Sequence, residues 1–199
     1  MAGPNRTYKV MQDLTGYFRT GQREAIYNAC KTDRDKLIIK LLWKTGRRIG
    51  EVLLIKIKDL DFEQNNILWN IEKKKKEHRA WKPIDSETME QVKLYVEKEG
   101  LTTESFLFPS NSGSGHITRQ WVFNVVRKAC ADCGINYVGG KQPHPHHFRH
   151  SFAIEKARKM KSPADLRKLQ MYMEHATIDM TQNYLQFGDE EMRSLVEDE

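Results

Sequence analysis

The chain has 199 residues, a length that suits one compact domain, and 39% of them are apolar, which is enough for a hydrophobic core and excludes global disorder. The formal net charge is +6, and residues 189–199 hold six acids and one Arg, net −5, so residues 1–188 carry +11. A basic body favours a polyanionic partner, with nucleic acid first and an anionic membrane second, although composition alone also allows a basic surface without such a partner.

Three features set the expected compartment. No stretch approaches the roughly 20 apolar residues that a bilayer span needs. The N-terminal residues MAGPNRTYKV lack the apolar core of a signal peptide. Cys30, Cys130 and Cys133 form an odd and sparse set, unlike the disulfide framework of a secreted protein. We therefore expect an intracellular, cytoplasmic protein with no membrane partner.

The N-terminal third of the sequence predicts helices after an irregular start. Residues 1–19 are polar, and we expect a flexible lead-in. Helical spacing of apolar residues covers 21–30 and 33–45. Gly46 is a plausible helix stop, because Gly tolerates the left-handed cap. A shorter helix is predicted from about 48 to 55.

The middle of the sequence predicts the sheet. Residues 66–71 and 78–84 resemble two strands that flank a lysine-rich turn. A helix over 87–99 is expected to end at Gly100. Residues 106–115 read as a strand fragment followed by a loop.

The C-terminal part is helical in pattern. Helical spacing covers the ranges 117–133, 146–160, 163–173 and 177–186, and a last amphipathic helix is predicted near 189–196. The fold class expected from all these elements is α+β, predominantly helical, with a small antiparallel sheet of about three strands.

Two basic segments have both functional and structural interpretations. In TGRRIGE (45–51), Arg48 and Glu51 lie three apart at a helix start, which suits an anion site or a solvent-facing ion pair. IEKKKKEHR (71–79) holds four lysines in a predicted turn. A lysine there could reach a DNA phosphate or donate a proton. Alternatively, the lysines are a solvated charge run that keeps a sheet edge from aggregating.

A histidine-rich segment, HPHHFRHSFA (144–153), raises the question of a metal. Histidines downstream of the Cys130/Cys133 pair suggest zinc. However, this CxxC lies in a predicted continuous helix, and zinc ligands usually occupy a turn. The alternative is that His146 and Arg149, one helical turn apart, face a common ligand.

The segment MEHATIDMTQNYLQF (173–187) places Tyr184 nine residues after His175. Taken alone, Tyr184 is most simply a half-buried core aromatic. The four segments together favour a functional role for Tyr184, because they follow one another in the order Arg, lysine turn, HxxR, His and Tyr.

This series resembles the tyrosine recombinase or phage integrase family, whose C-terminal catalytic domain carries it, and the resemblance covers about residues 20–187. TGRRIGE is similar to the first arginine box, PHHFRHSFA to the HxLRH box and EHATIDMTQNY to the GHxxxxTTxxY box. Phe148 stands where Leu is more usual, and Glu174 where Gly is usual.

The resemblance implies a set of catalytic residues. Arg48 and Arg149 would bind phosphate oxygens, His146 would accept the tyrosine proton or hold the phosphate, and His175 would donate to a nonbridging oxygen. Tyr184 would be the nucleophile and Glu51 a supporting residue. Lys74 is the family's general acid if one counts back from Arg79, but the segment is one residue longer than usual, so Lys73, Lys75 or Lys76 could serve instead.

The function implied is site-specific DNA recombination or integration through a 3′-phosphotyrosyl intermediate, without metal, ATP or a small-molecule cofactor. The partners implied are double-stranded DNA and further copies of the chain. The acidic tail, 188–199, would dock on a neighbouring protomer or pack on its own domain. Because the family usually carries an N-terminal DNA-binding domain, the chain reads as a fragment or a minimal enzyme.

Two other functions remain open. A type IB-like topoisomerase shares the Tyr, Arg and Lys chemistry, and would relax supercoils without exchanging strands between two sites. A DNA-binding module that has lost catalysis is disfavoured by the complete residue set, since a pure binder has no need of Tyr184.

Overall fold

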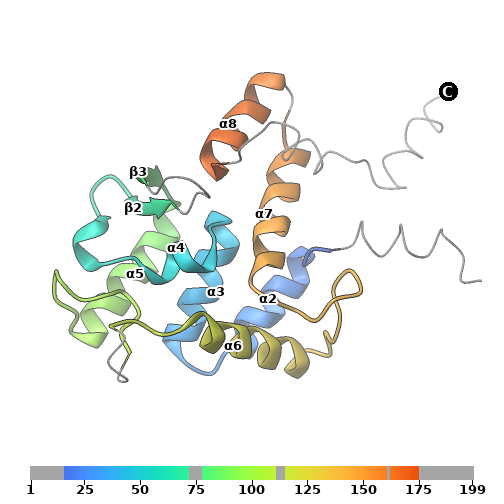
Figure 1. The fold of residues 1–199 in the computed structure, drawn as a ribbon, viewed down its shortest axis with the longest axis horizontal. Coiled ribbons are helices and arrows are strands. Elements are labelled where there is room, and N and C mark those ends of the chain that lie inside the picture. Colours follow the sequence, from blue (N-terminus) through green and yellow to red (C-terminus); the bar gives the residue numbers. More distant parts are fainter. Residues whose placement is uncertain (1–15, 72–77, 111–114, 161, 175–199) are drawn as a thin grey trace, which may run out of the picture.

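The structure is a computed structural model, and it describes residues 16–71, 78–110, 115–160 and 162–174. The described elements, drawn in Figure 1, are α2 (Thr20–Ala29), α3 (Asp33–Thr45), α4 (Ile49–Leu53), the 3-10 turn η1 (Ile57–Asp59), β1 (Leu60–Asp61), β2 (Asn66–Ile71), β3 (His78–Pro83), α5 (Ser86–Glu99), α6 (Arg119–Asp132), α7 (His146–Arg158) and α8 (Pro163–Met173). The helices predicted at 177–186 and 189–196 lie outside the described residues.

Helix α3 is the central element of the fold, and α2, α4, α5, α6 and α7 all pack against it. Its sequence sets both of its ends. The hydroxyl of Thr32 accepts a hydrogen bond from the backbone of Asp35, and Gly46 adopts the left-handed conformation with φ 61°. The side chains between these ends are largely buried and form the middle of the main core.

The sheet has three antiparallel strands in the order β1-β2-β3. Strand β2 alternates as expected, with Ile67, Trp69 and Ile71 buried against the core. The predicted strand fragment at 106–115 is corrected by the structure. Among the described residues it forms only isolated bridges, including one between Lys56 and Phe106, and the third strand is β1. Strand β1 pairs with β2 over two residues, whereas β2 pairs with β3 along its whole length.

Helices α7 and α8 form a second, smaller core. Phe152, Ala153 and Ala157 of α7 pack there against Leu169 and Met173 of α8. This small core sits on the turn after α3, since a methyl group on Gly46 would lie 2.5 Å from the Phe152 ring. The arrangement brings the end of α8 over the start of α4.

Several predicted helix ends differ from the observed ones by one or two residues. The short helix expected over 48–55 spans Ile49–Leu53, and the helix expected over 146–160 spans His146–Arg158. Within the described residues, no helix combines the length and apolar character needed to cross a bilayer.

Candidate active site

Arg48 and Glu51 form a pair at the start of α4. The Arg48 backbone N–H donates to Glu51 Oε2 at 3.2 Å, and its Nη1 donates to Oε1 at 2.9 Å. The Glu51 side chain has no exposed surface, whereas that of Arg48 is 29% exposed. The pair is therefore not the solvent-facing ion pair that the sequence of TGRRIGE also allowed. A buried carboxylate instead orients an arginine whose charge stays accessible.

Arg47 is a site residue that sequence reasoning missed. Its side chain is fully buried, with Nη1 3.8 Å from a Glu51 oxygen. Its guanidinium carbon lies over the rings of Trp69 and Tyr172, 5.3 and 5.0 Å from their centroids. Burial lowers the pKa of Arg47, and the carboxylates of Glu51 and Glu174 oppose this shift. Arginine remains charged in proteins, so a permanent buried cation lies near the same carboxylate that Arg48 contacts. Its position next to the predicted Arg48 was the only signal in the sequence.

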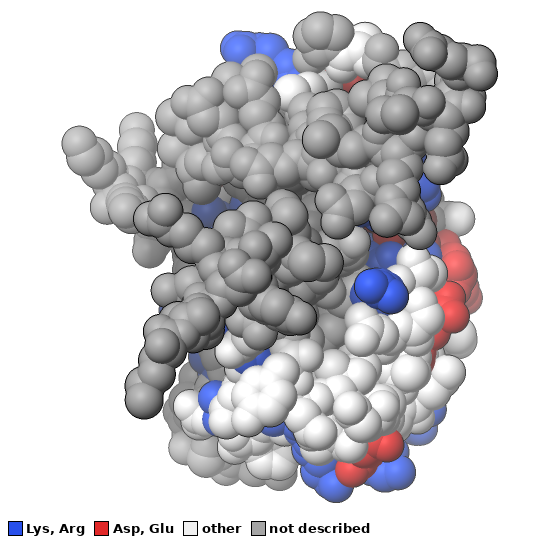
Figure 2. Space-filling model, turned by 90° about the vertical axis from the view of Figure 1, so that its right-hand side faces the viewer, with Lys and Arg blue, Asp and Glu red and all other residues white. Residues whose placement is uncertain are grey.

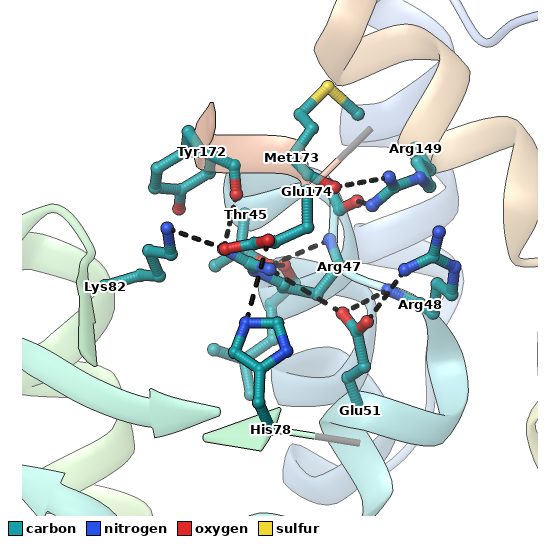
Figure 3. A network of polar contacts seen from close by, with 12 residues as sticks. Thr45, Arg47, Arg48, Glu51, His78, Lys82, Arg149, Tyr172, Met173 and Glu174 are labelled. Atoms are coloured by element: carbon teal, nitrogen blue, oxygen red, sulfur yellow. Dashed lines mark hydrogen bonds and ion pairs between the residues drawn. The ribbon is translucent and has the colours of Figure 1, made fainter. Parts of the chain in front are cut away.

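Arg149 joins the HxxR segment to the first arginine box. From α7, its Nη1 donates to the Gly46 carbonyl at 2.8 Å and its Nη2 to the Met173 carbonyl at 2.7 Å. The residue is only 3% exposed. Figure 3 shows Arg149 above Arg48, with Met173 and Glu174 from the end of α8 to their left. Two predicted arginines from distant parts of the sequence therefore share one site.

The C-terminal end of α8 accepts hydrogen bonds from basic side chains of β3, of α7 and of the turn between α3 and α4. The last four carbonyls of a helix lack partners within the helix. Here the Glu174 N–H donates to the Gln170 carbonyl, and Lys82 of β3 donates to that of Met171 at 3.1 Å. Arg47 donates to the Tyr172 carbonyl at 2.6 Å and Arg149 to that of Met173. Cations are also favoured at this negative end of the helix dipole.

Glu174 is a second site residue that the sequence did not single out for a role. It caps α8 in the left-handed conformation, φ 55°. Its Oε1 lies 3.0 Å from Lys82 Nζ and its Oε2 lies 3.7 Å from His78 Nε2 (Figure 3). The signal was the departure from Gly at this position of the box.

His146 is the first residue of α7 and is exposed. Desolvation by the surrounding protein is the largest cause of its lowered pKa, and the nearby charges of His150, Arg149 and Arg48 lower the pKa further. The imidazole is therefore neutral at pH 7 and able to accept a proton. The arginine contributions place His146 within the electrostatic field of both predicted arginines.

The other histidines of this segment have structural contacts. His147 is buried, its Nδ1 accepts from the His144 backbone at 3.2 Å, and the two rings stack at 3.8 Å. Burial lowers the pKa of His147 to about 3, so its ring is neutral. His147 therefore has a structural role in the core, unlike the exposed His146.

The zinc interpretation finds no support among the described residues. Cys130 is buried within α6 and Cys133 caps its end. Burial raises the pKa of Cys130 to about 12, which keeps the thiol protonated and a poor metal ligand. No group of three or more His, Cys, Asp or Glu side chains in the described parts of the chain could hold a metal ion.

A cationic pocket of about 540 Å³ opens beside the ends of β2 and β3. It is lined by Leu54, Lys56, Lys58, Asp59, Asn70, Ile71, His78, Arg79 and Phe106. Arg79 pairs with Asp59, and Lys58 with Glu104 at 2.7 Å. Elsewhere, on the face drawn in Figure 2, the described Lys and Arg side chains lie at separate places rather than in one continuous patch.

The remaining predicted residues lie outside the described part of the chain. These are Lys74 with its alternatives Lys73, Lys75 and Lys76, and His175 and Tyr184. The structure describes the residues that flank them. Ile71 and His78 border the lysine turn, and Glu174 directly precedes His175.

The chain is similar to tyrosine recombinases in sequence and in structure. The model of the phage integrase family matches residues 17–191. A tyrosine recombinase of Pseudothermotoga lettingae is 31% identical over 161 residues, which are 81% of this chain and 52% of that protein, so the chain spans about half the length of such a relative.

Two solved structures share the fold. XerA recombinase superposes with a TM-score of 0.73 at 24% identity, over 90% of this chain and 63% of that one. XerH site-specific recombinase, solved bound to its difH substrate before cleavage, gives 0.70 at 22% identity, over 94% and 55%. The predicted fold class, mostly helical with a three-stranded antiparallel sheet, is confirmed. Because the family model covers most of its length, the chain belongs to the phage integrase family, the family of the tyrosine recombinases.

Proposed function

We propose that this chain is the catalytic domain of a site-specific recombinase or integrase that cuts and rejoins double-stranded DNA through Tyr184. The observation that carries the proposal is the hydrogen bond from Arg149 to the Gly46 carbonyl, which joins residues 103 apart in the sequence. This bond brings both arginine boxes to one site. Two permanent cations are what the nonbridging oxygens of one phosphodiester need.

The proposed reaction is a transesterification. The Tyr184 oxygen attacks the phosphorus, its proton passes to His146, and the bond from phosphorus to the 5′-oxygen breaks. A lysine of the turn, Lys74 by the family pattern, protonates that oxygen. The products are a 3′-phosphotyrosyl ester and a free 5′-hydroxyl. Because the ester conserves the bond energy, a 5′-hydroxyl of another strand reseals it without ATP.

The geometry of the described residues supports these roles. Glu51 orients Arg48 without exposure to solvent, so the Arg48 charge is held toward the open side of the site. The lowered pKa of His146 favours the neutral form that accepts a proton. Removal of one such charge stabiliser typically slows catalysis by about 100-fold.

The test is a cleavage assay on nicked or supercoiled DNA in EDTA, followed by denaturing electrophoresis. We expect a covalent protein–DNA adduct that forms in EDTA and is absent with Tyr184→Phe. An adduct that persists in Tyr184→Phe would refute the assignment of the nucleophile. Arg149→Lys is the matched variant for the site, because it keeps the charge and loses the two-armed contact.

The same assay separates the alternative functions. Exchange of strands between two sites indicates a recombinase, and relaxation of supercoils without exchange indicates a type IB-like topoisomerase. DNA binding without an adduct indicates a binding module. Association of further copies on DNA, with the tail 188–199 docked on a neighbour, stays a prediction that size measurement of the protein–DNA complex would check.

A further inference from the structure

Glu174 connects two segments that the proposed reaction must bring together. Its carboxylate contacts Lys82 at 3.0 Å and His78 at 3.7 Å, both on β3. His78 is the first residue of β3, directly after the lysine turn, and Glu174 directly precedes His175. The Glu174 side chain is 13% exposed and that of Lys82 18%, so the contact between them is largely shielded from water.

The backbone of Glu174 adds a second observation. With φ 55° it adopts a conformation that glycine accommodates without strain, and among the described residues Asn65 is the only other non-glycine with positive φ. Glycine would cap α8 equally well but could not reach β3. Lys82 also donates to the Met171 carbonyl, so β3 contacts both the backbone and the cap residue of α8.

We propose that Glu174 is a positioning residue, which through Lys82 and His78 fixes the start of β3 relative to the end of α8. The inference rests on the proposed function. The group that depends most on this contact is the acid for the 5′-oxygen, because the lysines precede His78 by two to five residues. Glu174 itself touches no substrate in this proposal.

The test compares ordinary DNA with DNA in which sulfur replaces the bridging 5′-oxygen. A thiol has a pKa of about 8.5, so a thiolate leaves without an acid, whereas an alkoxide does not. We expect Glu174→Gln to cleave ordinary DNA about 10- to 100-fold more slowly than the wild type, because small displacements of a catalytic group have effects of that size. On the sulfur-substituted DNA the same variant should match the wild-type rate.

Two variants complete the design. Lys82→Met removes the partner, and we expect it to behave like Glu174→Gln, with the double variant no slower than either single one. Glu87→Gln is the matched control, because it breaks an ion pair with Lys40 of 2.6 Å on α5, away from the site, and should cleave both substrates normally. If Glu174→Gln does not fold, Lys82→Met replaces it under the same criterion.

The outcomes separate this inference from the proposed function. A wild type that forms no adduct on either DNA contradicts the proposed function. A wild type that cleaves, together with a variant that is equally slow on both substrates or unimpaired on both, overturns the positioning role of Glu174.

Discussion

Glu51 is the carboxylate around which the first arginine box is arranged. It is completely buried, and it accepts from the backbone and side chain of Arg48 while facing Arg47. A buried charge is tolerated only where opposite charges and hydrogen bonds surround it. Glu51 therefore has two effects, since it balances the buried cation of Arg47 and orients the accessible one of Arg48.

We predict that Glu51→Gln lowers both stability and cleavage. The amide keeps the shape but leaves the Arg47 charge without a buried counterion, which should lower the free energy of unfolding by about 3 kcal/mol. Urea unfolding and the rate of adduct formation measure the two effects. The matched control is Glu104→Gln, whose ion pair with Lys58 is exposed and should contribute less than about 1 kcal/mol. Equal losses in both variants would contradict the role of Glu51.

At the scale of elements, the turn between α3 and α4 is the junction of the site. Gly46 ends α3 with φ 61°, offers its carbonyl to Arg149 and lies against Phe152 of the small core. Only a residue without a side chain allows this close approach. The two cores therefore meet at a glycine, next to the arginines that the proposed reaction uses.

The two left-handed caps, Gly46 and Gly100, provide a matched pair of variants. Both have φ 61°, but a methyl group on Gly46 would lie 2.5 Å from Phe152, whereas on Gly100 it would meet no atom within 4 Å. We predict that Gly100→Ala costs about 1 kcal/mol from backbone strain alone. Gly46→Ala should cost about 3 kcal/mol, because overpacking adds to the strain. Similar thermal shifts in the two variants would show that Phe152 moves away without cost.

At the scale of the whole molecule, folding keeps several imidazoles neutral. Burial is the largest cause of the lowered pKa values of His144, His147 and His150. The unfolded chain protonates these rings near pH 6.5. The stability they contribute is complete above that pH and is lost as the pH falls toward about 3, the pKa of His147.

We therefore predict that urea unfolding at pH 5 shows a lower free energy than at pH 7. In His147→Asn, which retains an acceptor for the His144 backbone, this difference should shrink by about 1 to 2 kcal/mol. An unchanged pH dependence in the variant would mean that His147 titrates normally in the folded protein.

The sequence predicted most of the described helices and the β2–β3 hairpin, and it singled out four of the described residues as candidates for the site, for reasons that are local. Strand 66–71 and the helix over 33–45 follow from alternation, periodicity and a glycine cap, and Arg48, Glu51, His146 and Arg149 follow from spaced motifs. Arg47 and Glu174 could not be predicted. Their roles depend on partners more than 90 residues away, Tyr172 for Arg47 and the strand of Lys82 for Glu174. The two-residue strand β1 depends likewise on its pairing with β2.

The contacts around the end of α8 join residues far apart in the sequence, which affects when the site can form during synthesis. Arg47 bonds to a carbonyl 125 residues further along the chain, and Lys82 to one 89 residues further. During synthesis from the N-terminus, the first arginine box exists long before the helix end that completes its surroundings. A nascent or truncated polypeptide therefore holds the first arginine box without the contacts made by the end of α8, and we expect the proposed DNA cleavage only once the whole domain has folded.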